Sequence, residues 1–163
     1  MGRWFVVAGI PTMFEKGMIN AIEDYRFNAK KQRIDVSFYM QSKPSAKPTT
    51  VLQRAKITNT ETNTRWSLNP KVGFAYLPLR LSYLVIDCAE DYSTCIIGVP
   101  DRAYLWIMAR KHDIEESVLE TLISRCQYFG YDITKIVGVN HDYSSVSVPP
   151  FSYEEQAADG GSK

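Results

Sequence analysis

The stretch DRAYLWIMAR, Asp101 to Arg110, is apolar at every position from Ala103 to Ala109 and then ends on an arginine. A strand with one buried face alternates apolar and polar residues, so a continuous apolar run indicates a strand that is covered on both faces. The opening RWFVVAG, residues 3–9, and CIIGV, residues 95–99, have the same character. We therefore expect the first and last strands of a sheet to lie beneath another element.

The strands between these runs alternate. In RIDVSFYMQ, residues 33–41, the apolar side chains Ile34, Val36, Phe38 and Met40 fall on one face, which is typical of a half-buried antiparallel strand. Comparable runs, separated by turn residues, cover residues 21–28, 50–58, 64–76, 82–88 and 92–99. Eight strands without a crossover helix predict an all-β fold, an eight-stranded antiparallel up-and-down β-barrel that leaves no exposed sheet edge.

The hydrophobic period changes to three and four residues in HDIEESVLETLISRCQYFG, residues 112–130, which predicts one α-helix packed outside the barrel. Asp113 is the expected N-cap with Glu116 as its capping-box partner, and Gly130 occupies the expected C′ position. A short ninth strand, residues 133–139, is expected to follow. The chain then becomes rich in Ser, Pro and Gly, so we predict one domain over residues 1–142 and a flexible tail over residues 143–163.

Composition narrows the classes of function. The net charge of +1 gives no electrostatic reason to expect a nucleic-acid partner. No apolar run approaches the roughly 18–20 residues of a membrane-spanning helix. Neither the two separated histidines nor the three cysteines have the spacing of metal ligands, so we expect no metal site and no cofactor. The start, Met1-Gly2-Arg3-Trp4, lacks the pattern of a signal peptide, and we interpret it as the start of a trimmed chain.

Several short motifs carry a family resemblance. They are G-x-W at Gly2-Arg3-Trp4, the acidic-aromatic turn Glu90-Asp91-Tyr92, F-x-x-G at Phe14 to Gly17, and D-R-x-Y-L-W-I-x-x-R from Asp101 to Arg110. With these motifs the chain resembles the lipocalins, and within them the branch of bacterial outer-membrane lipocalins, plant temperature-induced lipocalins and apolipoprotein D. The resemblance extends from Gly2 to about Val139 and implies a barrel that is closed at one end and binds a ligand inside.

Strand directions bring the most widely separated of these motifs together. The first strand leaves one end of the barrel and the eighth returns to it, so Trp4 and Arg110 should meet there. A guanidinium over the indole is worth about 0.5–2 kcal/mol, and its N–H groups can satisfy strand carbonyls. The resemblance implies a closed floor made by Gly2, Trp4, Asp91, Tyr92 and Arg110. The alternative is that Arg110 is an ordinary solvated charge at the end of a strand.

With Trp4 inward, alternation predicts an apolar and aromatic wall without a charge in its middle. The residues that we expect to contact a ligand are Tyr25, Phe27, Val36, Phe38, Met40, Phe74, Tyr83, Val85, Tyr104, Trp106 and Met108. Such a wall suits a long apolar molecule, and the resemblance implies a fatty acid, a lysophospholipid or an isoprenoid-type lipid, for carriage or for protection of membrane lipids. The alternative is that these side chains simply fill the core of a small barrel.

The other end of the barrel is the predicted mouth. There the loop YLPLRL, residues 76–81, is conspicuously apolar. Its side chains Tyr76, Leu77 and Leu79 either press into a membrane surface or fold back over the mouth as a lid. Arg102 and Lys16, also near the mouth, can hold an anionic head group.

Two other classes of function remain open. A structural or interaction subunit of a membrane-associated assembly would use the barrel as a platform and need a protein partner. The resemblance implies that a lipid-modifying enzyme with this barrel would use a reactive cysteine inside it. Alternation places Cys88 and Cys95 outward, either as free thiols or bridged across their hairpin. We therefore expect a binding protein and not an enzyme. The resemblance favours a membrane-associated, periplasmic, organellar or extracellular location.

Overall fold

The computed structural model describes residues 1–144 and 146–151. Eight strands form the barrel: β1 (Gly2–Ile10), β2 (Ile19–Asn28), β3 (Arg33–Gln41), β4 (Thr49–Ile57), β5 (Arg65–Val72), β7 (Leu81–Cys88), β8 (Thr94–Gly98) and β9 (Leu105–Ala109). Each pairs antiparallel with the next, and β9 returns to β1, with Phe5 opposite Ala109 and Ile10 opposite Leu105. The predicted closed antiparallel barrel is confirmed.

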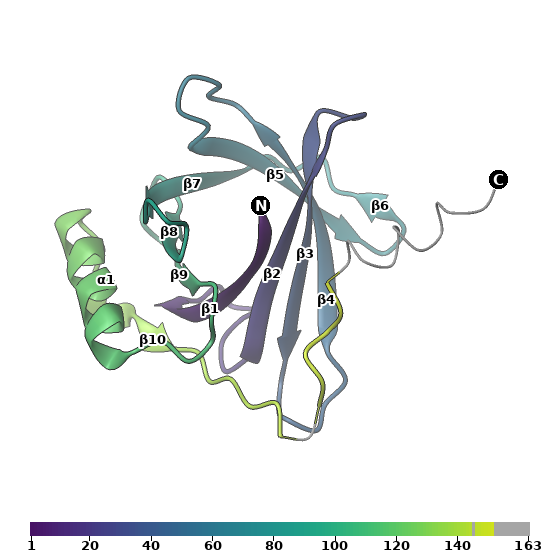
Figure 1. Ribbon diagram of the computed structural model, residues 1–163. Helices are drawn as coiled ribbons and strands as arrows, with labels where there is room; N and C mark the ends of the chain where they lie inside the picture. Colours follow the sequence, from purple (N-terminus) through teal and green to yellow (C-terminus); the bar gives the residue numbers. More distant parts are fainter. Residues whose placement is uncertain (145, 152–163) are drawn as a thin grey trace.

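The helix α1 (Glu116–Tyr128) lies against the outside of the barrel, beside β8 and β9 (Figure 1). Two apolar layers result. One fills the barrel interior around Trp4, Phe38 and Met108. The other lies between α1 and the outer faces of β1, β8 and β9, and includes Ile96, Ile107 and Cys126. This second layer explains the continuous apolar runs, because their strands bury side chains on both faces.

The two ends of α1 differ in how well the sequence predicts them. Asp113 is not the N-cap, so this prediction is wrong. The cap is Glu115, which has extended backbone and makes no side-chain cap bond, and the preceding Ile114 packs into the outer layer. Gly130 does occupy C′, with φ +83°. The N–H of Gly130 bonds to Gln127 and that of the next residue bonds to Cys126, which is a Schellman ending.

Two predicted strands are also corrected. The fifth strand ends at Val72, where the chain turns through Gly73 with φ +57° and folds back as β6 (Ala75–Tyr76) on β5. The predicted strand over residues 133–139 begins instead as a 3₁₀ turn, Ile133–Lys135, because the side chain of Asp132 accepts from the backbone N–H of Thr134. The strand itself is short, β10 (Val137–Gly138), and it pairs with β1.

The segment after β10 contacts the barrel as far as the structure describes it. Asn20 exchanges hydrogen bonds of 2.7 and 2.8 Å with the backbone of Asp142. The guanidinium of Arg3 forms a two-pronged ion pair with the buried Asp24 and donates to the carbonyl of Pro149 at 2.6 Å. The predicted flexible tail begins at Tyr143, and its residues 145 and 152–163 lie outside the described part of the chain. Within that part, no helix is long and apolar enough to span a membrane.

Candidate ligand-binding site

One end of the barrel is closed by Trp4 and Arg110. The guanidinium carbon of Arg110 lies 3.7 Å from the centre of the indole ring. Its N–H groups donate to the carbonyls of Met1, Arg3 and Tyr92 at 2.8, 2.5 and 3.1 Å. All three guanidinium nitrogens therefore donate to backbone carbonyls, and Arg110 links the start of the first strand to the turn after β7. It is not an ordinary solvated charge at the end of a strand.

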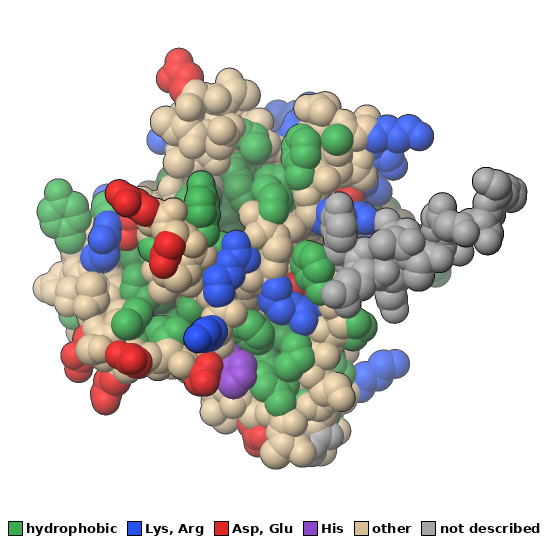
Figure 2. Space-filling model, in the orientation of Figure 1, with side chains coloured by type: hydrophobic (Ala, Val, Ile, Leu, Met, Phe, Trp, Pro, Cys, Tyr) green, Lys and Arg blue, Asp and Glu red, His purple; other side chains and the backbone are tan. Residues whose placement is uncertain are grey.

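The other floor residues shape the backbone around this contact. Gly2 has φ +87°, and a Cβ there would lie 3.2 Å from Nη1 of Arg110. Asp91 accepts from the backbone N–H of Ser93 at 2.9 Å, and hydrogen bonds from Ser93 lower the pKa of this carboxyl. Tyr92 has φ +57° and an exposed ring, so its carbonyl, not its ring, contacts Arg110. Figure 2 shows Lys and Arg side chains near the start of the chain and acidic ones gathered toward α1.

Most of the predicted wall residues lie together inside the barrel. Those in the interior layer or packed against it are Tyr25, Val36, Phe38, Met40, Tyr83, Val85, Trp106 and Met108. The ring of Tyr83 stacks at 5.2 Å on Trp66 and at 6.4 Å on Trp106, so aromatic faces cross the interior.

Three predicted wall residues do not lie there. Phe74 is fully exposed, because the chain turns at Gly73 before it can reach the interior. Phe27 is 45% exposed near the end of β2, and Tyr104 is 39% exposed just before β9 begins. Alternation places side chains correctly only within a strand, and these three residues lie at or beyond strand ends.

A buried polar bridge crosses the interior, which sequence reasoning missed. Glu23 is 4% exposed, and its partners in register are Trp4 on β1 and Phe38 on β3. Its carboxyl is hydrogen-bonded to the hydroxyl of Tyr83, which is also hydrogen-bonded to that of Tyr25. Because β2 and β7 are four strands apart in either direction around the barrel, this bridge spans its full width.

The expectation of a wall without charge is therefore corrected. Burial, together with the nearby Glu15, raises the pKa of Glu23 to about 8. Its Oε2 atom is buried and has no hydrogen-bond partner among the described residues. The signal was present in the sequence, since Glu23 has the same parity as Tyr25.

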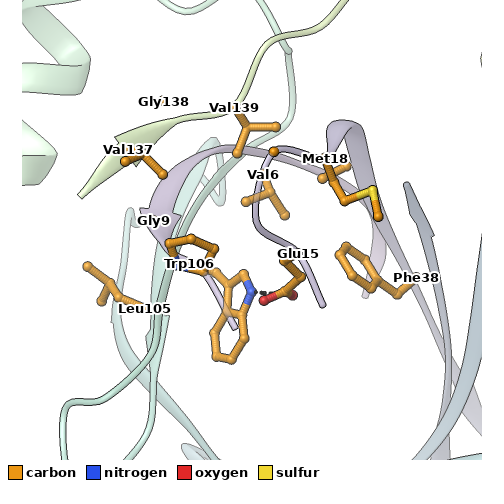
Figure 3. A pocket seen from close by; sticks show the side chains of 13 residues that line it. Val6, Gly9, Glu15, Met18, Phe38, Leu105, Trp106, Val137, Gly138 and Val139 are labelled. Atoms are coloured by element: carbon orange, nitrogen blue, oxygen red, sulfur yellow. Dashed lines mark hydrogen bonds between the residues drawn. The ribbon is translucent and has the colours of Figure 1, made fainter. Parts of the chain in front are cut away.

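Above this bridge, toward the open end, lies a cavity of about 300 Å³. Its walls include Val6, Met18, Ala21, Phe38 and Trp106. Glu15, from the loop between β1 and β2, reaches into the cavity, where one carboxylate oxygen accepts from the indole N–H of Trp106 at 3.0 Å (Figure 3). The other accepts from the backbone N–H of Thr12 at 2.7 Å. The long first loop thus partly covers the mouth.

The cysteines beside the floor point inward and not outward. A β-bulge between Val85 and Asp87 shifts the alternation of β7 and turns Cys88 inward. Its partner in register, Cys95, also lies in the interior layer, where it pairs with Met108 of β9. Both are free thiols. Desolvation raises the pKa of each, most strongly at Cys95, which keeps these thiols from ionising.

The mouth carries exposed apolar side chains. Leu79 is exposed, whereas Tyr76 is partly covered, with the guanidinium carbon of Arg54 3.5 Å from its ring centre, and Leu77 is also half-buried. The first loop adds Met13 and Phe14, which are 80% and 81% exposed. Phe14 was noted only as part of the F-x-x-G motif and Met13 not at all, because an isolated pair of residues in a loop has no periodicity.

A closed eight-stranded barrel with one sealed end, one open end and an apolar cavity defines a class of proteins that bind small molecules inside a β-barrel. The family model that describes a lipocalin-like domain matches residues 1–141. The chain belongs to the lipocalin family, which binds small hydrophobic ligands and whose members are generally binding or carrier proteins.

Individual relatives agree with this assignment. Temperature-induced lipocalin-1 of Arabidopsis thaliana is 26% identical over 167 aligned residues, which cover 93% of this chain and 80% of the relative. The outer membrane lipoprotein Blc of Vibrio cholerae is 26% identical over 140 residues, covering 85% and 78%. Insecticyanin from the tobacco hornworm Manduca sexta has a similar fold, with a TM-score of 0.68 at 18% identity, covering 90% of this chain and 80% of that one.

Proposed function

We propose that the protein binds a membrane-derived lipid of the fatty acid, lysophospholipid or isoprenoid type in the barrel cavity, and carries it or protects membrane lipids. The observation that carries this proposal is the cavity itself, which has a sealed floor, an open mouth and aromatic and aliphatic walls. Its volume of about 300 Å³ is at the lower end of ordinary ligand pockets, which suits a single chain or a small ring system. The predicted contact residues that support it are those inside the barrel, such as Phe38, Tyr83 and Trp106.

Ligand exchange at a membrane surface belongs to the same proposal. Met13, Phe14, Phe74 and Leu79 are exposed apolar side chains on two loops at the open end, where they can enter the interface of a bilayer. This placement supports a membrane-associated or periplasmic location, as does the relationship to an outer membrane lipoprotein. Tyr76 and Leu77 contribute less than the sequence suggested, because both are partly covered.

The proposed role is binding without catalysis. Burial raises the pKa of Cys126 to about 11, and the interior thiols are raised as well, so none of the three cysteines is a ready nucleophile. Within the described residues, no three or more His, Cys, Asp or Glu side chains gather in a group that can hold a metal ion.

The first test is organic extraction of protein purified without detergent, followed by mass spectrometry of the extract. We expect a stoichiometric lipid, either as purified or after incubation with a lipid mixture. An extract that stays empty in both cases would contradict the proposal and favour a structural subunit, which would be recovered with a protein partner.

A pair of variants tests whether the ligand binds in the cavity. Ala21→Phe projects a ring into the cavity and should abolish lipid uptake while the circular dichroism spectrum stays that of a β-barrel. Leu52→Phe is the matched control, because Leu52 lies outside the interior layer and is exposed on β4. Equal uptake by both variants would place the ligand elsewhere.

A further inference from the structure

The cavity is acidic and, among its described lining residues, has no counter-charge. Glu15 is the one ionisable side chain among the residues that form its wall. Its two hydrogen-bond donors, the indole of Trp106 and the backbone of Thr12, are both neutral. None of the ion pairs between described residues includes Glu15. A carboxylate has about four lone-pair sites, so Glu15 retains acceptor capacity toward the cavity.

A second carboxyl group lies directly below the cavity, toward the closed end of the barrel. Glu23 is two residues beyond the wall residue Ala21 on the same face of β2, and its partner on β3 is the wall residue Phe38. Its Oε2 atom is buried and finds no partner in the described part of the chain, which is costly unless a further group completes the site. The cavity thus has a carboxyl group at its side and another below it.

Aromatic faces complete the surroundings. Trp106 and Phe38 both line the cavity, and Trp106 is the residue that holds Glu15 in place (Figure 3). A carboxylate beside the faces of aromatic rings is the environment that recognises an ammonium group, through an ion pair and through the ring quadrupole. For a ligand carboxylate or phosphate, the same cavity supplies like charge and, among the described residues that line it, no cationic side chain.

We infer that the cavity selects amphiphiles that carry a cationic nitrogen over those that carry a carboxylate, with Glu15 as the counter-ion. This inference rests on the proposed function and narrows it. Single-chain amphiphiles that bear an ammonium group and no anionic group are favoured, and free fatty acids are disfavoured.

The test compares three probes with one alkyl chain and different head groups: dodecylamine, laurate and dodecanol. Their affinities for the full chain at pH 7 are measured by isothermal titration calorimetry below their aggregation concentrations. We expect dodecylamine to bind at least about tenfold more tightly than laurate, as a partly desolvated ion pair with ring contacts allows. In Glu15→Gln the ratio of the dodecylamine affinity to the laurate affinity should fall close to one. The affinity of each variant for dodecanol is the uncharged reference. The control Glu61→Gln, which removes an exposed carboxyl in the turn after β4, should keep the ratio of the unmodified protein.

The outcomes separate the inference from the function on which it rests. If dodecanol binds and laurate binds as tightly as dodecylamine, the selectivity is refuted, but the proposed function as a carrier of hydrophobic ligands is retained. If the amine preference persists unchanged in Glu15→Gln, the role of Glu15 is refuted. If none of the three probes binds, the proposed function fails and the inference fails with it.

Discussion

Glu23 makes the stability of the barrel depend on pH in an unusual direction. Its pKa is raised from 4.5 to about 8 in the folded protein, mainly because burial disfavours the charged form. Between these two values the folded state holds a proton that the unfolded state has released, so raising the pH favours unfolding. The contribution of Glu23 is therefore fully present below about pH 4.5 and is lost as the pH rises through about 8.

The structure gives the size of the effect. Each pH unit in this window costs about 1.4 kcal/mol, so the loss between pH 5 and pH 8 is on the order of 4 kcal/mol. For a chain of this size that corresponds to roughly 10 °C in the melting temperature. Glu23→Gln keeps the shape and hydrogen-bonding capacity of the side chain but does not titrate. The variant should therefore match the parent near pH 5 and become progressively more stable than it toward pH 8.

The assay is urea unfolding followed by circular dichroism at several pH values from 5 to 8.5. The quantity of interest is the difference in the free energy of unfolding between parent and variant, because other groups also titrate in this pH range. His141, for example, is half-buried and donates from Nε2 to the carbonyl of Val6. Burial lowers its pKa, so its contribution to stability is lost as the pH falls below 6.5 toward that lowered pKa. Glu61→Gln, which removes an exposed carboxyl, is the control. Its free energy of unfolding should change with pH in the same way as that of the parent. A parent–variant difference that does not change with pH would refute the assignment of a proton to buried Glu23.

Four further substitutions test the barrel itself. Trp4→Ala should cost about 3–5 kcal/mol in urea unfolding, because it removes the buried indole and the ring on which Arg110 stacks; an unchanged transition would refute the sealed floor. Gly9→Ala should lower the free energy of unfolding by about 1–3 kcal/mol, because the new Cβ would lie 2.2 Å from the carbonyl oxygen of Leu105. The control Gly138→Ala should cost less than about 1 kcal/mol, because its Cβ meets nothing within 4 Å. Equal costs would show that β1 and β9 are not held this close. Phe38→Asp should abolish lipid binding with the helix signal retained, and retained binding would mean that this face of β3 points away from the ligand.

The fold was predictable because its signals are repeated many times along the chain. The alternation in β3 and the continuous apolar run of β9 each specify which faces are buried, and together they require a closed barrel with α1 over its seam. The meeting of Trp4 and Arg110 follows from the same counting, since antiparallel strands fix which ends lie together. Gly130 was predictable because the Schellman ending needs a residue that tolerates positive φ.

The missed features are those that alternation cannot encode. The bulge after Val85 reverses the direction of Cys88, and nothing in the local sequence distinguishes a bulge from a regular strand. Cys95 is different, because its regular pairing with Met108 of β9 places both side chains on the inner face. The turn at Gly73 removes Phe74 from the wall, although a glycine inside a strand pattern was a warning. Glu23 was overlooked for a different reason, because its parity was known but a charged side chain was assumed to avoid the interior.

The charges near the interior explain why Glu15 and Glu23 favour a cationic ligand group over an anionic one. The closed end has a cation, Arg110, but its N–H groups are bonded to three backbone carbonyls and its planar face is stacked on Trp4. It therefore has little capacity left to neutralise a ligand carboxylate. Glu23, by contrast, has an unsatisfied oxygen, and its raised pKa means that the folded barrel bears an energetic cost at neutral pH. An ammonium group in the cavity would reduce that cost by favouring the charged carboxylate. Binding of dodecylamine should accordingly stabilise the parent against urea more than Glu23→Gln at the same occupancy, and equal stabilisation would show that Glu23 does not sense the ligand.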